Sequence, residues 1–134
     1  MLAARRVRPV PQLPPETIAR RATERVTGES PTAAEGRVLG SIAHLAFGAM
    51  GGALYGAGHQ LIGMRGLLPS VVSAVGFANV IYAVSYQGWV PALRILPPAT
   101  DDNKERVSTM VAAHWVFGAA LGAVTWWLSR DARR

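Results

Sequence analysis

The sequence contains no cysteine and few charged residues. The absence of cysteine excludes disulfides, thiolate nucleophiles and cysteine-ligated iron–sulfur clusters. Charged residues make up only 16% of the 134 residues, whereas an ordinary soluble domain carries about 25%. No catalytic motif is recognisable among the residues that remain, so we expect a protein that is not an enzyme.

The few charges are distributed so that three long stretches carry none. Residues 38–64, 66–93 and 107–129 contain no Asp, Glu, Lys or Arg over 27, 28 and 23 residues. About 20 apolar residues in a helix are enough to cross the hydrocarbon core of a bilayer. The sequence therefore predicts an all-α integral membrane protein with three transmembrane helices.

Prolines, glycines and helix-capping residues indicate where these helices begin and end. Thr32 to Glu35 has the spacing of a capping box, and so has Asp102 to Glu105. We expect three segments: a basic Pro/Arg-rich cytoplasmic arm with a short helix (1–32), a transmembrane domain (33–129) and a C-terminal tail (130–134). The spans within the domain are expected at about 33–63, 67–90 and 103–129.

The first 32 residues combine prolines with arginines. Four prolines and three arginines among the first 15 residues predict an extended basic arm. Residues 16–27 predict a short amphipathic helix, with Ile18, Ala22 and Val26 repeating on one face and three arginines beside them. Two interpretations of this helix stay open: it lies on an anionic membrane face, or it is solvated or disordered.

Positive charge is concentrated at the ends of the chain and in the loops. Of the 14 Lys and Arg residues, seven precede residue 38 and three lie in the second loop or in the first turn of the third span. Cytoplasmic segments of membrane proteins are rich in Lys and Arg, so we expect the N-terminus to be cytoplasmic. The pI near 11 then reflects membrane topology, and we expect no nucleic-acid partner.

A twelve-residue pattern occurs twice, once in the first span and once in the third. Residues 43–54 and 113–124 agree at seven positions, in the form A-H-x-x-F-G-A-x-x-G-A. One span separates the two copies, so they run in the same direction and place His44 and His114 at a similar depth. This pair is the most specific candidate site in the sequence.

His44 and His114 allow a functional and a structural interpretation. Two histidines at one depth on facing helices, with glycine nearby, could bind a b-type haem as a cofactor. Alternatively, each neutral imidazole bonds a carbonyl or hydroxyl group within the bundle, which we favour because no further motif accompanies the pair. No third ligand or carboxylate lies near either histidine in the sequence, so we expect no metal site.

Glycines at helical spacing form the candidate packing faces. They are Gly48, Gly52 and Gly56 in the first span, and Gly118 and Gly122 in the third. Lipid supplies no hydrophobic drive for helices to associate, so close backbone contact across small residues holds many transmembrane helices together. The sequence therefore predicts helices that pack through small-xxx-small faces.

Several polar side chains fall inside the predicted spans, where they need hydrogen-bond partners. They are Tyr55, His59, Asn79, Tyr82 and Tyr86. The second span also presents a small and polar stripe that could meet either glycine face, namely Gly76, Asn79, Ala83 and Tyr86. A polar lining would suit an oligomeric channel or transporter component, although no Asp or Glu lies within a span.

The order of these motifs resembles a known family. The motifs are His44-x-x-Phe47-Gly48, Gly52-x-x-Tyr55-Gly56, Trp89-x-Pro91-Ala92-Leu93, Pro97-Pro98 and His114-x-x-Phe117-Gly118. They are similar to motifs of the uncharacterised bacterial inner-membrane proteins related to YagU, over about residues 40–122. The resemblance implies a location in the bacterial inner membrane, and it implies no reaction and no catalytic residue.

Taken together, these features predict a small polytopic membrane protein that acts through helix packing, as a homo-oligomer or as an accessory subunit of a membrane complex. Its expected partners are the lipid bilayer and other membrane-protein subunits, including copies of itself. The alternatives are a b-type haem electron carrier that uses His44 and His114, and an oligomeric channel or transporter component.

The predicted orientation can be measured directly, because an introduced cysteine would be the only thiol in the chain. Val10→Cys should react with a membrane-impermeant maleimide only after the cells are opened, since the N-terminus is expected to be cytoplasmic. Ala132→Cys should react in intact spheroplasts. Labelling of both positions from the same side of the membrane would contradict a topology of three spans.

Overall fold

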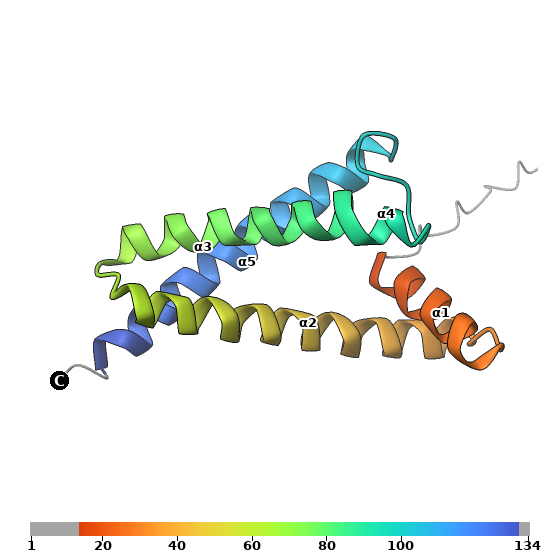
Figure 1. The fold of residues 1–134 in the computed structure, drawn as a ribbon, viewed down its shortest axis with the longest axis horizontal. Helices are drawn as coiled ribbons and strands as arrows, with labels where there is room; N and C mark the ends of the chain where they lie inside the picture. Colours follow the sequence, from red (N-terminus) through yellow and green to blue (C-terminus); the bar gives the residue numbers. More distant parts are fainter. Residues whose placement is uncertain (1–13, 132–134) are drawn as a thin grey trace, which may run out of the picture. The chain divides into compact units, whose positions relative to one another are not determined.

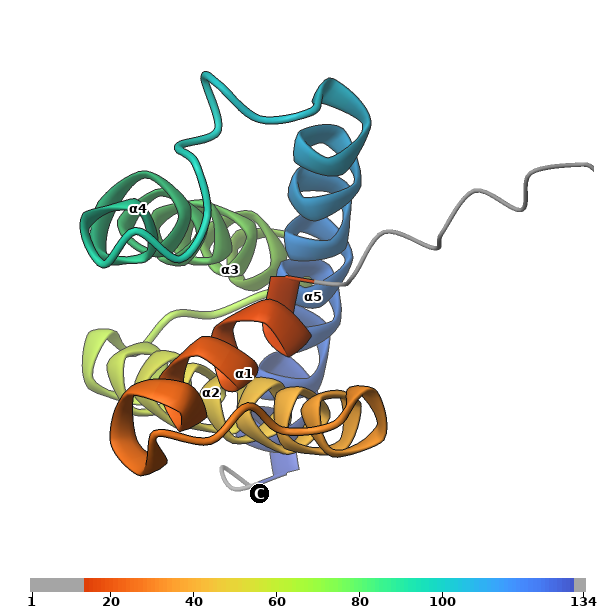
Figure 2. The same ribbon diagram turned by 90° about the vertical axis from the view of Figure 1, so that its right-hand side faces the viewer.

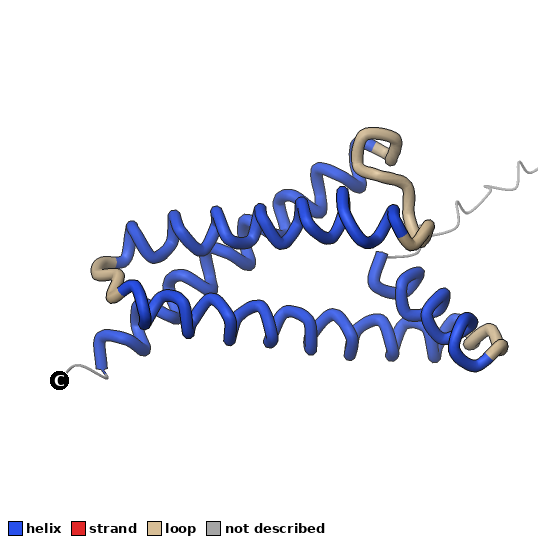
Figure 3. The backbone as a smooth tube through the Cα atoms, in the orientation of Figure 1, coloured by secondary structure: helices blue, strands red, loops and turns tan. Residues whose placement is uncertain are grey.

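A computed structural model describes residues 14–131, and all regular structure among them is helical (Figures 1 and 3). Of the extended basic arm predicted over residues 1–15, residues 1–13 lie outside the described residues, as does the end of the predicted tail, 132–134. Pro14 and Pro15, expected in that arm, instead begin the first helix, where proline is tolerated because its missing N–H would have no partner. Three helices are long and apolar enough to cross a membrane. The prediction of an all-α protein with three transmembrane helices is confirmed.

Six helical segments follow one another within residues 14–131. They are α1 (Pro14–Thr27), α2 (Ala33–Ile62), α3 (Leu67–Tyr82), the π-helical η1 (Ala83–Trp89), α4 (Val90–Ala92) and α5 (Lys104–Asp131). α3, η1 and α4 are continuous and form the second span. The spans expected from the sequence differ from these bounds by one or two residues at an end.

Local sequence signals explain both ends of α2. The backbone N–H of Thr32 donates to Glu35 Oε2 at 2.8 Å, and the N–H of Glu35 donates to Thr32 Oγ1 at 3.3 Å. This reciprocal pair is the predicted capping box. At the other end Gly63 has a φ of 66°, a left-handed conformation that favours glycine. Its N–H bonds the Gln60 carbonyl at 3.1 Å and closes the helix.

The residue that caps α5 differs from the prediction. Asn103 Oδ1 accepts a hydrogen bond from the N–H of Glu105 at 2.8 Å, so Asn103 is the cap and the Asp102 cap was wrong. Asp102 Oδ1 accepts from the N–H of Asn103 at 2.7 Å, one residue before the helix. Asp and Asn are equally good caps, so the sequence located the helix start and left the capping residue ambiguous.

The second span widens from an α-helix to a π-helix over Ala83–Trp89. The N–H of Val90 donates to the Ser85 carbonyl, five residues earlier. Pro91 follows directly; it has no N–H to continue a regular α-helix, and its ring crowds the carbonyl four residues before it. The wider turn accommodates this crowding. It also carries Tyr86, which is only 2% exposed.

The described residues form two compact units, divided between Ala43 and His44. In the first unit the chain turns after α1 at Gly28, where φ is 75°, and α1 crosses the beginning of α2 (Figure 2). A Cβ atom at Gly40 would lie 2.8–2.9 Å from backbone atoms of Pro15 and Glu16. A real Cβ atom essentially never lies so close to a nonbonded backbone atom, so only glycine permits this crossing.

In the second unit α3 and α5 pack with their backbones in contact. A Cβ atom at Gly118 would lie 2.7 Å from Val75 Cα, and one at Gly122 would lie 2.5 Å from the Ser70 carbonyl oxygen. The later of the two glycines on α5 therefore lies against the earlier of the two residues on α3. The two helices are thus antiparallel. Figure 1 shows α5 crossing α3 obliquely. This close approach is the small-residue packing that the sequence predicted for the third span.

The face of α3 that lies against the glycines of α5 is not the stripe proposed from the sequence, although Asn79 of that stripe does bond α5. The contact face consists of Ser70, Ala74 and Ala78, all completely buried. Gly76, which headed the proposed stripe, is exposed, and nothing lies within 4 Å of its Cβ position. The two glycines of α5 supply the necessary space, so α3 can present alanine and serine to them.

The glycines of α2 lie in different surroundings. A Cβ atom at Gly48 would lie 4.0 Å from the Phe117 ring, and one at Gly52 would lie 3.7 Å from Leu121 Cδ1. Both are ordinary contacts with side chains, and Gly56 has open space around it. The sequence repeat therefore has one closely packed copy, in α5, and one loosely packed copy, in α2.

The two copies should respond differently to an added methyl group. Gly118→Ala and Gly122→Ala should each lower the free energy of unfolding by about 1–3 kcal/mol, because the methyl group would overlap the α3 backbone, which cannot rotate away. Gly51→Ala in α2, where nothing lies within 4 Å of the Cβ position, is the matched control and should be neutral. Denaturation of the purified protein in detergent measures the effect. Equal stability of all three variants would contradict backbone contact between α3 and α5.

Candidate functional site

Two groups of polar side chains lie among the described residues of the second unit. The Ser70 cluster consists of Tyr55, His59, Ser70 and Ser73. The Asp102 cluster consists of Tyr82, Tyr86, Asp102, Arg106 and His114. The Ser70 cluster lies near the turn between α2 and α3, and the Asp102 cluster lies at the other end of the second span.

The Ser70 cluster joins α2 to the first turns of α3. His59 Nε2 lies 2.8 Å from Ser70 Oγ, and the two residues are only 3% and 0% exposed. Tyr55 OH donates to the Ser70 carbonyl at 2.8 Å and lies 2.7 Å from Ser73 Oγ. These bonds satisfy polar groups at membrane depth, as the sequence required of Tyr55 and His59. They also hold α2 to α3 through long side chains and without backbone contact.

The hydrogen bonds of Ser70 determine the tautomer of His59. The Ser70 hydroxyl donates its single proton to the Gly66 carbonyl at 2.8 Å, so His59 Nε2 carries a proton and donates to Ser70 Oγ. In the neutral imidazole, Nδ1 would then be the nitrogen that accepts a hydrogen bond. It is buried and has no hydrogen-bond partner among the described residues. His59 therefore joins α2 to α3 through Nε2 and leaves Nδ1 as a hydrogen-bonding site that no described residue uses.

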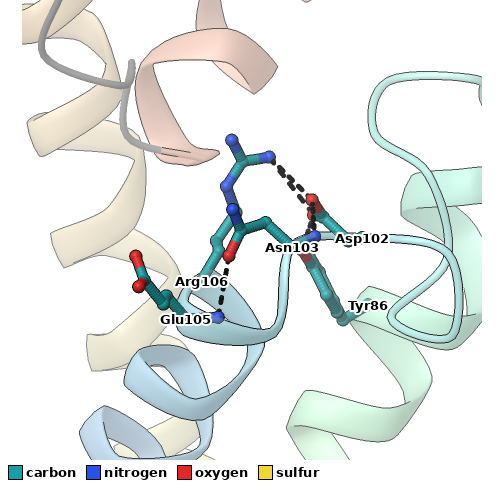
Figure 4. A network of polar contacts seen from close by, with 5 residues as sticks. All are labelled: Tyr86, Asp102, Asn103, Glu105 and Arg106. Carbon is teal, nitrogen blue, oxygen red and sulfur yellow. Dashed lines mark hydrogen bonds and ion pairs between the residues drawn. The ribbon is translucent and has the colours of Figure 1, made fainter. Parts of the chain in front are cut away.

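Asp102 forms the centre of the second cluster and joins α5 to η1 (Figure 4). Its Oδ2 accepts a hydrogen bond from Tyr86 OH, and Arg106 Nη1 donates to both carboxylate oxygens at 3.2 Å. The side chain of Asp102 is 6% exposed and that of Arg106 is 30% exposed. The carboxylate is therefore both paired and hydrogen-bonded, which a charge with so little access to water requires.

The environment of Asp102 lowers its pKa below the ordinary value. Burial raises the pKa of this carboxyl group, but the hydrogen bonds from Tyr86 and from the backbone N–H of Asn103 stabilise the ionised form. The charge of Arg106 acts in the same direction, and the net effect is a lowered pKa. Asp102 is thus an anion at neutral pH, and it acts as a fixed acceptor for two neighbouring elements.

Aromatic rings extend the Asp102 cluster into the bundle. The ring of Tyr82 stacks on that of Tyr86 with centroids 5.5 Å apart, and His114 meets Tyr82 edge-on at 5.3 Å. His114 Nδ1 lies 2.7 Å from the Met110 carbonyl, which can only accept, so Nδ1 carries the proton. The Tyr82 hydroxyl is buried and has no hydrogen-bond partner in the described part of the chain.

The two histidines of the repeat lie in different surroundings. His114 is half-buried against Tyr82, whereas His44 is exposed on α2. No hydrogen bond or ring contact joins them among residues 14–131, and no group of three His, Cys, Asp or Glu side chains in that range could hold a metal ion. The haem interpretation stays a prediction from the sequence. A bonded carbonyl, which we expected for a structural histidine, is present at His114.

Asn79 has the partner that its depth in the membrane required. Its Oδ1 accepts a hydrogen bond from Trp115 Nε1 at 3.0 Å, which links α3 to α5 beside the glycine contact. Trp115 was not expected to take part, because it is one of the positions at which the two repeat copies differ. Of the two copies of the repeat, only the one in α5 forms this hydrogen bond.

Sequence reasoning also missed Ser70, Ser73, Asp102 and Arg106 as partners of the predicted tyrosines and histidines. The serines carry no signal, because serine is common in transmembrane helices and its partner is 11 or more residues away in the sequence. Asp102 and Arg106 did carry a sequence signal, because opposite charges four residues apart at the start of a helix form an ion pair.

Comparisons of the chain with protein-family models, with curated proteins and with solved structures find no match.

The Asp102 cluster predicts a dependence of stability on pH. The folded protein lowers the pKa of Asp102 below its unfolded value of about 3.9, so the carboxylate stabilises the fold fully above that pH. This stabilisation is lost as the pH falls through the lower, folded pKa. The melting temperature of the wild type should therefore decrease below about pH 4, and that of Asp102→Asn should decrease less.

Asp102→Asn should also destabilise the protein at pH 7 by about 1–3 kcal/mol, because Arg106 loses its charged partner and Tyr86 a strong acceptor. The matched control is Asp101→Asn at the exposed neighbouring residue, which should have the stability of the wild type. If both variants melt at the same temperature at every pH, Asp102 does not join α5 to η1.

Proposed function

We propose that this chain is a small polytopic protein of the bacterial inner membrane that acts through helix packing, as a homo-oligomer or as an accessory subunit of a membrane complex. It has no catalytic activity of its own in this proposal, and its N-terminus is cytoplasmic. Membership of the family related to YagU belongs to the same proposal and contributes the location, not the packing argument.

The observation that carries the proposal is the difference between the two glycine faces. Gly118 and Gly122 are used within the chain, where their backbones contact α3. Gly48, Gly52 and Gly56 have the same spacing, yet they have only side-chain neighbours at 3.7 Å or more, or none. Glycine weakens a helix unless the space it leaves is used. A further helix packed on α2 would use it.

The exposed alanines of α2 adjoin these glycines. Ala49, Ala53 and Ala57 recur every four residues, lie on one side of the helix and are all exposed. Together with Gly56 they form a smooth surface of small side chains, on which a second helix can approach closely. The large exposed side chains Met50 and Leu54 border this row, three residues before Ala53 and Ala57, and are open to lipid.

Disulfide crosslinking tests the proposal in native membranes. Ala53→Cys places a single thiol on the small-residue face, and oxidation should yield a covalent dimer if two copies pack through α2. The matched control is Val116→Cys, on a lipid-exposed side of α5 where the side chain is 71% exposed. It should stay monomeric under the same conditions.

The same variants separate the two forms of the proposal. If the chain is an accessory subunit, Ala53→Cys carrying a photocrosslinker should form an adduct with another membrane protein and no homodimer, while Val116→Cys forms neither. Crosslinking at both positions alike, or at neither, would contradict a packing role for this face of α2.

A further inference from the structure

Two contacts define how α2 lies against α5. A Cβ atom at Gly48 would lie 4.0 Å from the Phe117 ring, and one at Gly52 would lie 3.7 Å from Leu121 Cδ1. Four residues further along α2 thus correspond to four residues further along α5. The two helices therefore run in the same direction, and their levels can be matched residue by residue.

This register places the two histidines of the repeat at one level. His44 lies one turn before Gly48, so it belongs to the row of α2 that faces α5. His114 lies three residues before Phe117 and four before Gly118, so it lies on α5 between the row that faces α2 and the row that faces α3. The two imidazoles are therefore on facing sides of neighbouring parallel helices.

His44 is a polar side chain inside the span without a hydrogen bond. It is exposed, and no hydrogen bond joins it to another of the described residues. It follows Arg37 by seven residues, about 10 Å along the helix, so it lies within the hydrocarbon and not at its edge. A polar side chain at this depth is costly unless it binds something.

The hydrogen bond of His114 leaves its other nitrogen available to a metal. Nδ1 carries the proton and lies 2.7 Å from the Met110 carbonyl, so in the neutral imidazole Nε2 has the free lone pair. The edge-on contact with Tyr82 orients the ring. Histidines that bind metals almost always donate their other N–H to a carbonyl or carboxylate in this way, which fixes the tautomer and makes the ligand more basic.

The number of ligands indicates the kind of metal centre. Protein sites for single metal ions such as Zn²⁺ use at least three side chains, and no such group of His, Cys, Asp or Glu exists among residues 14–131. Haem brings four nitrogen ligands of its own, so two axial imidazoles complete its iron. Nothing lies closer than 4.0 Å to a Cβ atom at Gly48, which leaves room beside His44 for the edge of the macrocycle.

We propose that the second unit binds one b-type haem between α2 and α5, with His44 and His114 Nε2 as the two axial ligands of the iron. Ala53, in the small-residue face, is nine residues or about two and a half turns from His44, and so lies on the opposite side of α2. The haem site is therefore separate from that face and does not depend on the helix-packing proposal.

Titration of the full chain in nanodiscs with haemin tests the site. The wild type should bind one haem per chain, and magnetic circular dichroism should show six-coordinate low-spin iron with two imidazole ligands. His44→Ala and His114→Ala should each weaken binding by at least about 10–100-fold, because loss of even an outer partner of a metal ligand has an effect of that size. The haem that these variants still bind should be five-coordinate and high-spin.

Added imidazole separates iron ligation from a structural role. It should restore the low-spin spectrum of His44→Ala, because free imidazole can occupy the vacated axial position but cannot replace a packing contact. The matched control is His59→Gln, which removes the third histidine of the chain and keeps a side-chain N–H for Ser70. It should bind haem like the wild type.

Three results would overturn the proposal. A wild type without a low-spin species at saturating haem would mean that the two imidazoles do not reach one iron. A low-spin spectrum that survives the loss of either histidine would mean that another group ligates the iron. One haem per two chains would mean that the axial ligands come from two copies of the chain and not from α2 and α5 of one.

Discussion

The second unit depends on backbone contact between α5 and α3. Gly118 and Gly122 lie so close to Val75 and Ser70 that no side chain fits between the helices. In lipid, apolar side chains gain nothing by leaving the solvent for one another, so van der Waals contact between backbones and a few hydrogen bonds must hold the helices together. The bond from Trp115 to Asn79 beside the glycines is one of these. The other contacts of the unit are arranged around this crossing.

Ser70 connects the crossing to the remaining span. Its backbone lies under Gly122, while its side chain bonds His59 of α2, so one residue contacts both neighbouring helices. At the other end of the second span, Asp102 performs a similar task with charge, because it binds Tyr86 of η1 and Arg106 of α5. Within the span an imidazole and hydroxyl groups make these bonds, and the carboxylate serves in the loop, where a charge costs less.

The sequence predicted the elements better than their partners. Charge-free runs gave the three spans, and Thr32 with Glu35 gave the start of α2, because both signals are local. At the contact between α3 and α5, the sequence predicted the glycine face of α5 but not the face of α3 that packs on it. Alanines such as Ala74 and Ala78 are too common to mark an interface, whereas paired glycines stand out. The π-helical turn at Tyr86 left a signal only in Pro91, and Asp102 was taken for a cap because its long-range partner is 16 residues away.

The sequence order of the spans has a consequence for biosynthesis. α2 and α3 leave the ribosome before α5, and until α5 arrives they are joined mainly by the side chains of the Ser70 cluster. During this interval the small face of α3, with Ser70, Ala74 and Ala78, is open to lipid and to any other helix with a glycine groove. Correct assembly therefore requires α5 to reach that face first. The connecting loop, only eleven residues from 93 to 103, favours this outcome by keeping the two helices close.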